Sequence, residues 1–186
     1  KLINSYFFNR NERIIPFSKQ INSDLCRELC KLKLGLYPNI NFFYDKLAKW
    51  IKIPKDMIFI TEGLDGAIRT TIECFTNNKS EIVFLDPSYA MYKVYAEMYN
   101  LKYKTITYDK DYNLTIDKIY RKINSNTAII FLPIPNMPIE GIVSDKEILK
   151  LLKFCQRKKI ILFIDEVYYP FGKSSFFHLL DKYNNL

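Results

Sequence analysis

Two carboxylates, Asp165 and Glu166, directly follow an unbroken apolar run, Ile160 to Ile164. A run this short and this apolar predicts a strand that is buried on both faces of a parallel sheet. Open α/β sheets bind their ligands at the carboxyl ends of the strands. Asp165 is therefore a candidate for electrostatic or acid–base chemistry at the edge of a pocket. The alternative is an ordinary strand-end acid that caps the next turn.

Three other loops between predicted strands and helices carry candidate ligand-binding groups. Gly63 and Gly66 mark a helix start, where free N–H groups and the positive end of the helix dipole suit one phosphate. Tyr89 stands at another helix start, where its ring can stack on a flat ligand. Asn136 offers an amide donor and acceptor within a proline-rich loop. Taken singly, these features also fit a tight turn, a packed tyrosine and a turn-forming asparagine.

The first of these loops disfavours a dinucleotide or a nucleoside triphosphate as the ligand. The segment Thr61-Glu-Gly-Leu-Asp-Gly-Ala67 does not match the Gly-x-Gly-x-x-Gly pattern of dinucleotide-binding folds. It also does not match the P-loop of nucleoside triphosphatases. A Rossmann dehydrogenase is accordingly the least supported alternative.

Strand and helix patterns alternate from Met57 onward. Strands are predicted at Met57–Thr61, Ile82–Leu85, Lys102–Tyr108, Thr127–Leu132 and Ile160–Ile164. Helices are predicted between them, over 64–75, from Asp86 to Asn100, after a Thr115 cap, and from the capping-box pair Ser144 and Glu147. This alternation predicts an α/β fold with a largely parallel sheet.

The first 54 residues lack such strand–helix units. One helix is predicted after Asn22 or Ser23, ending at Gly35, and another after Asn41. We interpret this part as an appendage to the main domain.

Composition points to an ordinary globular protein. The chain has 186 residues, 48% of them apolar and 26% charged, and a net charge of +8. Its lysines are spread along the chain, unlike the basic blocks of nucleic-acid-binding arms. No apolar span of membrane length and no signal-peptide pattern occurs. We expect a cytoplasmic protein that binds neither nucleic acid nor membranes.

The four cysteines, Cys26, Cys30, Cys74 and Cys155, lie in apolar helical patterns, and the only histidine, His178, is distant in sequence. No metal site is expected from this set. We expect buried free thiols in a reducing compartment.

Taken together, the loops resemble those of class I/II aminotransferases, which are fold-type-I enzymes that use pyridoxal 5'-phosphate (PLP), and especially the histidinol-phosphate aminotransferase branch. Gly63-Leu-Asp-Gly-Ala-Ile68 resembles that family's phosphate loop, and Asp86-Pro-Ser-Tyr-Ala-Met-Tyr92 its ring-stacking motif. Ile164-Asp-Glu-Val-Tyr168 is similar to its Asp-Glu-x-Tyr motif. Asn9-Arg-Asn-Glu12 and Leu36-Tyr-Pro38 look like its N-terminal arm.

The resemblance implies a three-layer α/β/α fold. Residues 1–54 would form the N-terminal arm and small-domain helices, and 55–186 the PLP-binding large domain. It also implies a homodimeric transaminase that moves an amino group between an amino acid and a 2-oxo acid. The same scaffold hosts PLP-dependent decarboxylases, and a degenerate, non-catalytic PLP-fold module is a further alternative.

The resemblance also implies site residues. Asp165 would face the pyridine nitrogen, and Tyr168 would hydrogen-bond the phenolic oxygen of the ring; these two are the catalytic candidates. Tyr89 would stack on the ring. The phosphate would be held by the backbone N–H groups of Leu64 and Asp65 beside Gly63, and by Tyr37 of the other subunit.

Two departures from the family pattern stand out. The family's Asn-Pro-x-Gly loop has its cofactor asparagine directly before proline, whereas Met137 precedes Pro138 here and Asn136 lies one place earlier. Either Asn136 serves in a shifted register or the contact is lost. The Schiff-base lysine and the substrate arginine of the family fall beyond Leu186, and Lys173 and Lys182 lack its Ser-Lys setting. We expect an N-terminal segment that is inactive alone.

Overall fold

The computed structural model describes residues 12–139, 143–171 and 175–186. The chain divides into two compact units, Lys1–Phe43 and Tyr44–Leu186. The boundary lies within a helix that the sequence assigned to the first part, so residues 44–54 belong structurally with the main unit. The assignment of 1–54 and 55–186 to an arm and a cofactor domain stays a prediction.

The first unit contains helix α1 (Lys19–Leu29), whose N-cap is Ser18. The Ser18 hydroxyl oxygen accepts a hydrogen bond from the backbone N–H of Ile21 at 3.3 Å. The predicted cap at Asn22 or Ser23 is therefore wrong, because Ser18 already satisfies the first-turn N–H group. The predicted end at Gly35 is also wrong, since α1 ends at Leu29.

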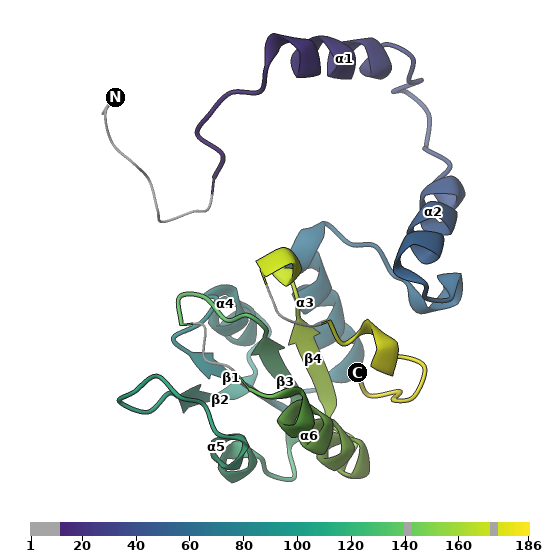
Figure 1. Ribbon diagram of the computed structural model, residues 1–186. Helices are drawn as coiled ribbons and strands as arrows, with labels where there is room; N and C mark the ends of the chain where they lie inside the picture. Colours follow the sequence, from purple (N-terminus) through teal and green to yellow (C-terminus); the bar gives the residue numbers. More distant parts are fainter. Residues whose placement is uncertain (1–11, 140–142, 172–174) are drawn as a thin grey trace. The chain divides into compact units, whose positions relative to one another are not determined.

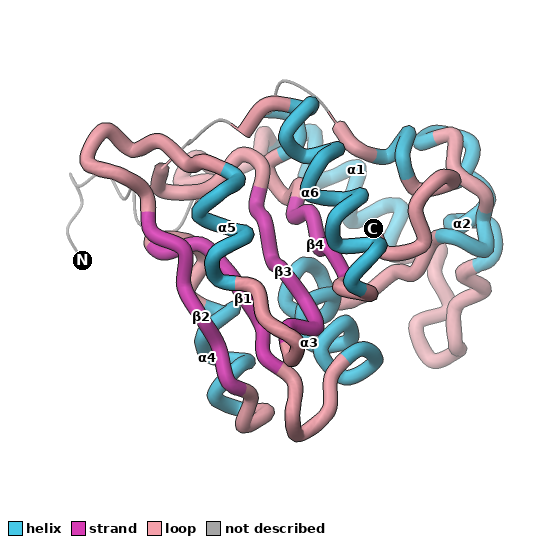
Figure 2. The backbone as a smooth tube through the Cα atoms, turned by 90° about the horizontal axis from the view of Figure 1, so that it is seen from below, coloured by secondary structure: helices cyan, strands magenta, loops and turns pink. Residues whose placement is uncertain are grey.

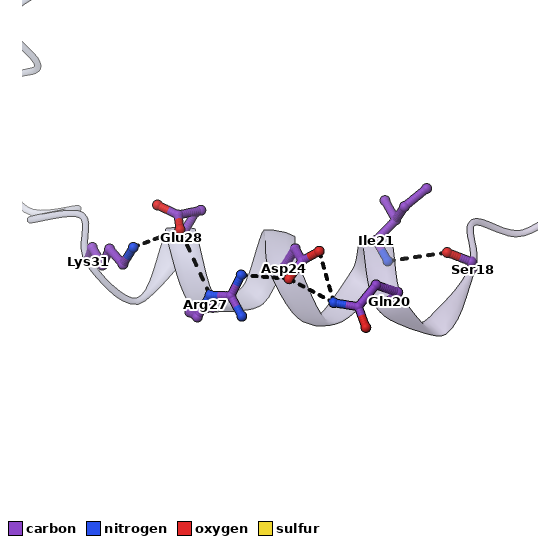
Figure 3. Close-up of polar contacts among 7 residues, drawn as sticks. All are labelled: Ser18, Gln20, Ile21, Asp24, Arg27, Glu28 and Lys31. Carbon is purple, nitrogen blue, oxygen red and sulfur yellow. Dashed lines mark hydrogen bonds and ion pairs between the residues drawn. The ribbon is translucent and has the colours of Figure 1, made fainter.

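The polar face of α1 is tied together by short-range contacts (Figure 3). Asp24 accepts from Gln20 at 3.1 Å and from Arg27 at 2.6 Å, and Glu28 accepts from Lys31 at 2.7 Å. None of the residues of α1 is buried. Exposed ion pairs at this spacing contribute only about 0.3–0.5 kcal/mol each. Local contacts therefore support this helix without giving the unit a core.

Helix α2 (Asn41–Ile51) forms where the sequence predicted a second helix, but Asn41 is its first residue and not its cap. The Asn39 side chain accepts from the N–H of Asn41 at 3.1 Å. The Tyr44 hydroxyl oxygen accepts from the backbone N–H of Ile60 at 3.1 Å. This bond, together with the ion pair between Lys55 and Asp45, joins α2 to the segment before the next helix. These two interactions explain why the residues from Tyr44 onward belong to the second unit.

The second unit is built on a four-stranded parallel sheet in the order β2-β1-β3-β4 (Figures 1 and 2). The strands are β1 (Glu81–Asp86), β2 (Lys102–Thr107), β3 (Thr127–Pro133) and β4 (Ile161–Asp165). Because all four run the same way, their carboxyl ends meet at one edge of the sheet, with Pro133 paired to Asp165.

Helices cover both faces of this sheet, which confirms the three-layer α/β/α prediction. Helices α3 (Gly63–Phe75) and α4 (Met91–Met98) pack on one face. Helices α5 (Ile116–Lys122) and α6 (Asp145–Lys158) pack on the other. Successive strand residues point to opposite faces. In β1, for example, Phe84 joins the cluster under α3 and α4, whereas Val83 and Leu85 join the cluster under α5 and α6.

Strand β4 lies at one edge of the described sheet. The backbone N–H of Leu162 donates to the carbonyl oxygen of Asn185 at 2.8 Å. An apolar cavity of about 510 Å³ lies beside β4 and is lined in part by Phe176 and Leu186. The expected burial of this strand on both faces is accordingly only partial: Leu162 and Asp165 are buried, and Ile161, Phe163 and Ile164 are half-buried.

Two predicted elements differ in the structure. Met57–Thr61 is not a strand: a 3-10 helix, η1 (Lys55–Met57), precedes an extended stretch in which Phe59 is 73% exposed. A strand forms only where a neighbouring strand accepts its backbone hydrogen bonds, and the described sheet offers this stretch none. The helix expected from Asp86 begins only at Met91, because residues 87–90 form the loop after β1.

All four cysteines are free thiols, but the prediction that they are buried is wrong for three of them. Cys26, Cys30 and Cys74 are exposed, and only Cys155 is buried. The apolar stripe of α1 suggested burial, yet none of the residues of α1 is buried. Burial raises the pKa of the Cys155 thiol to about 12.

The capping box at the start of α6 is present as predicted. The N–H of Glu147 donates to the Ser144 hydroxyl oxygen, and the Glu147 carboxylate accepts from the N–H of Ser144 at 3.0 Å. We expect Ser144→Ala to lower the free energy of unfolding by about 1 kcal/mol, as measured by urea denaturation.

These hydrogen bonds lower the pKa of Glu147. The contribution of a carboxylate with a lowered pKa is present above its ordinary pKa and is lost as the pH falls through the folded value. The destabilisation should therefore shrink in acid. Ser125→Ala, at an exposed loop serine, is the control. Equal effects of the two changes would contradict the assignment.

Candidate active site

The start of α3 and the end of β4 line one cavity of about 240 Å³ at the carboxyl edge of the sheet. Its walls include Gly63, Leu64 and Asp165, which are far apart in sequence. The predicted phosphate loop and the predicted pyridine-facing acid are thus brought together. This convergence follows from the chain path: α3 leads into the amino end of β1, so its start lies at the opposite, carboxyl edge of the sheet, where β4 ends.

Asp165 is 3% exposed and is held at both carboxylate oxygens. Oδ2 accepts from the Tyr92 hydroxyl at 2.5 Å, and Oδ1 accepts from the N–H of Val167 at 3.0 Å. Burial raises the pKa of Asp165, and the two hydrogen bonds act in the opposite direction. A carboxylate has about four acceptor sites, so Asp165 retains the capacity to accept a further donor.

Tyr89 is fixed from two sides. Its hydroxyl donates to Asp65 Oδ1 at 2.9 Å, and its ring meets that of Tyr92 edge-on, with centroids 5.9 Å apart at 89°. Burial, followed by the hydrogen bond to Asp65, raises the pKa of Tyr89 to about 12. The side chain is 41% exposed. The tyrosine is therefore anchored at its tip while much of its surface stays open to a ligand.

The first turn of α3 is open to an anion. The N-cap residue, Glu62, makes no side-chain hydrogen bond to this turn, and Gly63 has a positive φ of 72°. The N–H groups at the start of a helix lack partners within the helix, so those of Leu64 and Asp65 suit a phosphate. A Cβ atom at Gly66 would come within 2.7 Å of Glu62 Oε2, so glycine permits the close approach of the preceding loop.

Asn136 is 1% exposed and its amide is fully engaged within the protein. The amide nitrogen donates to the carbonyl oxygen of Pro87 at 3.0 Å and to the Tyr108 hydroxyl at 2.6 Å. The amide oxygen accepts from the Ser88 hydroxyl at 2.8 Å. Asn136 therefore joins the loops after β1, β2 and β3, and its contact with a cofactor stays a prediction. Met137 is 40% exposed.

The remaining predicted residues lie outside this cavity or outside the described residues. Tyr168 lies half-buried in the turn after β4. Tyr37 is fully exposed and belongs to the first unit, so its phosphate contact stays a prediction. The arm residues Asn9 to Asn11, the loop residues Glu140 and Gly141, and Lys173 lie outside the described residues. No cluster of acidic, histidine and cysteine side chains in the described ranges could hold a metal ion.

Two residues within the predicted motifs, Tyr92 and Glu166, have contacts in the structure that the sequence did not predict. Tyr92 supplies the hydroxyl that binds Asp165, and its position three residues after Tyr89 is the signal that could have suggested it. Glu166 accepts from the N–H of Phe176 at 2.7 Å and from the Ser175 hydroxyl at 2.8 Å. Glu166 thus ties the following segment to the end of β4.

Residues 4–186 match the family model of aminotransferase class I and II. The chain belongs to this family. It is 30% identical over 179 residues to a histidinol-phosphate aminotransferase of Clostridium novyi, covering 95% of this chain and 49% of the relative. A Bacteroides thetaiotaomicron histidinol-phosphate aminotransferase is 32% identical over 142 residues, covering 75% of this chain and 40% of the relative. The chain thus spans about half the length of the curated relatives that it matches.

Solved structures confirm the fold of this aminotransferase chain as fold type I. A putative histidinol-phosphate aminotransferase from Erwinia carotovora atroseptica superposes with a TM-score of 0.81 at 19% identity, covering 95% of this chain and 53% of the other. Cystalysin from Treponema denticola, which contains a pyridoxal 5'-phosphate cofactor, gives 0.71 at 17% identity, with 82% and 41% covered. The names of the relatives do not favour the decarboxylase or non-catalytic alternatives.

No helix among the described residues is both long and apolar enough to cross a lipid bilayer.

Proposed function

We propose that the protein containing this chain is a PLP-dependent aminotransferase, which moves an amino group between an amino acid and a 2-oxo acid. The observation that carries this proposal is the shared cavity of Asp165 and the open first turn of α3. A buried acid and an anion-binding helix N-terminus lie together at the carboxyl edge of the sheet. This arrangement suits a ligand that has a basic ring nitrogen at one end and a phosphate at the other.

The residues present fit this cofactor. Asp165 retains acceptor capacity and is buried, which strengthens its interaction with a protonated ring nitrogen. The uncapped N–H groups of Leu64 and Asp65, beside Gly63, hold the phosphate. Tyr89 stacks on the ring, and Tyr168 donates to its phenolic oxygen. When bound, PLP acts as an electron sink for the carbanion formed at the substrate. Asp165 favours this by keeping a proton on the pyridine nitrogen.

The loop that contains Met137 changes one cofactor contact. A thioether cannot replace an amide donor, and the amide of Asn136 is already engaged with Pro87 and Tyr108. We infer that the phenolic oxygen of the ring receives its hydrogen bond from Tyr168 without an amide partner. This differs from the asparagine-containing pattern that the sequence resembles.

We further propose a cytoplasmic homodimer in which Tyr37 reaches the phosphate in the other subunit. The exposed apolar residues of the first unit, among them Ile21, Leu25 and Leu29, support a partner surface for this part of the chain.

The test is to add PLP to the whole protein and record absorption in the visible range, followed by assays with panels of amino acids and 2-oxo acids. We expect a saturable cofactor band and transfer of the amino group without release of carbon dioxide. Absence of the band would refute the proposal. Release of carbon dioxide in the first half-reaction would replace transamination by decarboxylation.

A further inference from the structure

We propose that Tyr92 is a positioning residue whose hydroxyl fixes the Asp165 carboxylate in the orientation from which it meets the cofactor ring. This inference rests on the proposed function, because Asp165 has a partner to meet only if the ring is bound there. Nothing in the sequence motif assigns this task to Tyr92, which lies one helical turn after the predicted stacking residue.

The ring of Tyr92 is locked in place by the sheet. The residue is 0% exposed, and its ring stacks on Phe131 of β3 with centroids 5.0 Å apart at 23°. It also meets Phe84 of β1 at 6.0 Å and 38°. Interiors this closely packed leave an aromatic side chain little freedom. This packing therefore holds the Tyr92 hydroxyl at a fixed position beside the carboxyl end of β4.

The hydroxyl links Asp165 to a different layer of the fold. The other donor that the carboxylate receives, the N–H of Val167, belongs to the same turn as Asp165 and moves with it. The bond from Tyr92 spans 73 residues of sequence and joins β4 to α4. Because the two donors bind different oxygens of the carboxylate, together they define the plane of the acid.

The same bond acts on the charge of the acid. Burial disfavours a carboxylate, and a hydrogen bond donated to it favours the charged form. Tyr92 lowers the pKa of Asp165 against the upward effect of burial. An ionised acid is the form that can pair with a protonated ring nitrogen. The Tyr92 hydroxyl thus contributes to both the orientation and the ionisation of Asp165, together with the N–H of Val167.

Tyr92 also touches Tyr89, whose hydroxyl binds Asp65 at the start of α3. Two tyrosines in edge-to-face contact therefore each donate to one aspartate: Tyr89 to Asp65 in the first turn of α3, where the phosphate would bind, and Tyr92 to Asp165 at the end of β4, where the ring would bind. Removing only the Tyr92 hydroxyl should disturb the ring end and leave the phosphate end unchanged.

The test compares Tyr92→Phe with Tyr99→Phe in the whole protein. Phenylalanine keeps the ring that packs on Phe131 and removes only the hydroxyl. Tyr99 lies at the end of the same helix, and its hydroxyl donates to Glu73, which does not line the cavity of Asp165. The readouts are the dissociation constant of PLP, the absorption maximum of the bound cofactor and the separate values of kcat and KM.

For Tyr92→Phe we expect an approximately tenfold weaker PLP affinity, the order for one hydrogen bond to a charged group. We also expect a shifted absorption maximum and a lower kcat with little change in KM. Tyr99→Phe should leave all of these unchanged. A structural role alone would lower thermal stability without moving the absorption maximum.

An unchanged affinity and spectrum in Tyr92→Phe would overturn the inference while the wild-type protein still binds PLP. If the wild-type protein binds no PLP, the proposed function fails and the inference fails with it. Should Tyr92→Phe not fold, 3-fluorotyrosine placed at position 92 keeps the ring and makes the hydroxyl a stronger donor. A shifted absorption maximum then supports the inference, and an unchanged one overturns it.

Discussion

Asp165→Asn is expected to lower kcat/KM for transamination by the whole protein by about 10²- to 10³-fold, the range for loss of a preorganised electrostatic group. Asparagine fills nearly the same volume at the end of β4, so the cavity it shares with Gly63 and Leu64 should persist. The amide is neutral and cannot hold a proton on the ring nitrogen. Steady-state kinetics with saturating PLP measure the effect.

The matched control is Asp117→Asn. Asp117 is an exposed acid in the first turn of α5, which covers the face of the sheet opposite α3. The kcat/KM of this variant should stay within about twofold of the wild-type value, since surface substitutions away from a site have small effects. If Asp165→Asn behaves like this control, Asp165 is an ordinary strand-end acid and the proposed site is wrong.

Asn136→Ala should act mainly on stability. The change deletes an amide that bonds Pro87, Ser88 and Tyr108 inside the protein. At about 1 kcal/mol for each lost hydrogen bond, the free energy of unfolding should fall by about 3 kcal/mol in urea titrations. Asn126→Ala, at an exposed asparagine before β3, should cost less than about 0.5 kcal/mol.

The activity of the same variants decides how the Met137 loop works. If Asn136 only joins three loops, Asn136→Ala retains much more kcat/KM than Asp165→Asn when both are assayed at temperatures where they remain folded. Equal losses would mean that Asn136 leaves its partners to contact the bound cofactor, so that the loop shifts its register around PLP.

The parts of the fold that sequence could predict are those defined by local patterns. Three of the paired strands lie at predicted apolar runs, and β2 lies where alternating residues predicted it. Ser144 caps α6 as predicted, because a capping box involves only neighbouring residues. Asp165 could be predicted as a site residue because open α/β sheets generally bind ligands at the carboxyl ends of their strands. The prediction of a strand at 57–61 was wrong because a strand also needs a neighbouring strand to pair with, which the residues of the segment itself do not show.

The contacts within the site could not be predicted from local patterns. Tyr92 and Asp165 are 73 residues apart, and Asn136 and Ser88 are 48 apart. Such pairs are set by the register of the parallel strands and by the packing of α4, which no single segment encodes. The cysteines illustrate the same limit: an apolar pattern indicates that a helix has an apolar face, and it does not show whether a given cysteine on that helix is covered by another element.

The two edges of the described sheet differ in chemistry. Strand β2 at one edge carries Lys102 and Lys104, and charged residues of this kind discourage pairing with another molecule. Strand β4 at the other edge reads Ile-Leu-Phe-Ile before Asp165. Asn185 accepts a hydrogen bond from the N–H of Leu162 and donates its side-chain amide to the carbonyl oxygen of Ile160. Phe176, Leu179 and Leu186 pack in the same core cluster as Leu162, so the end of the chain shields this apolar edge, whereas charge protects the edge at β2.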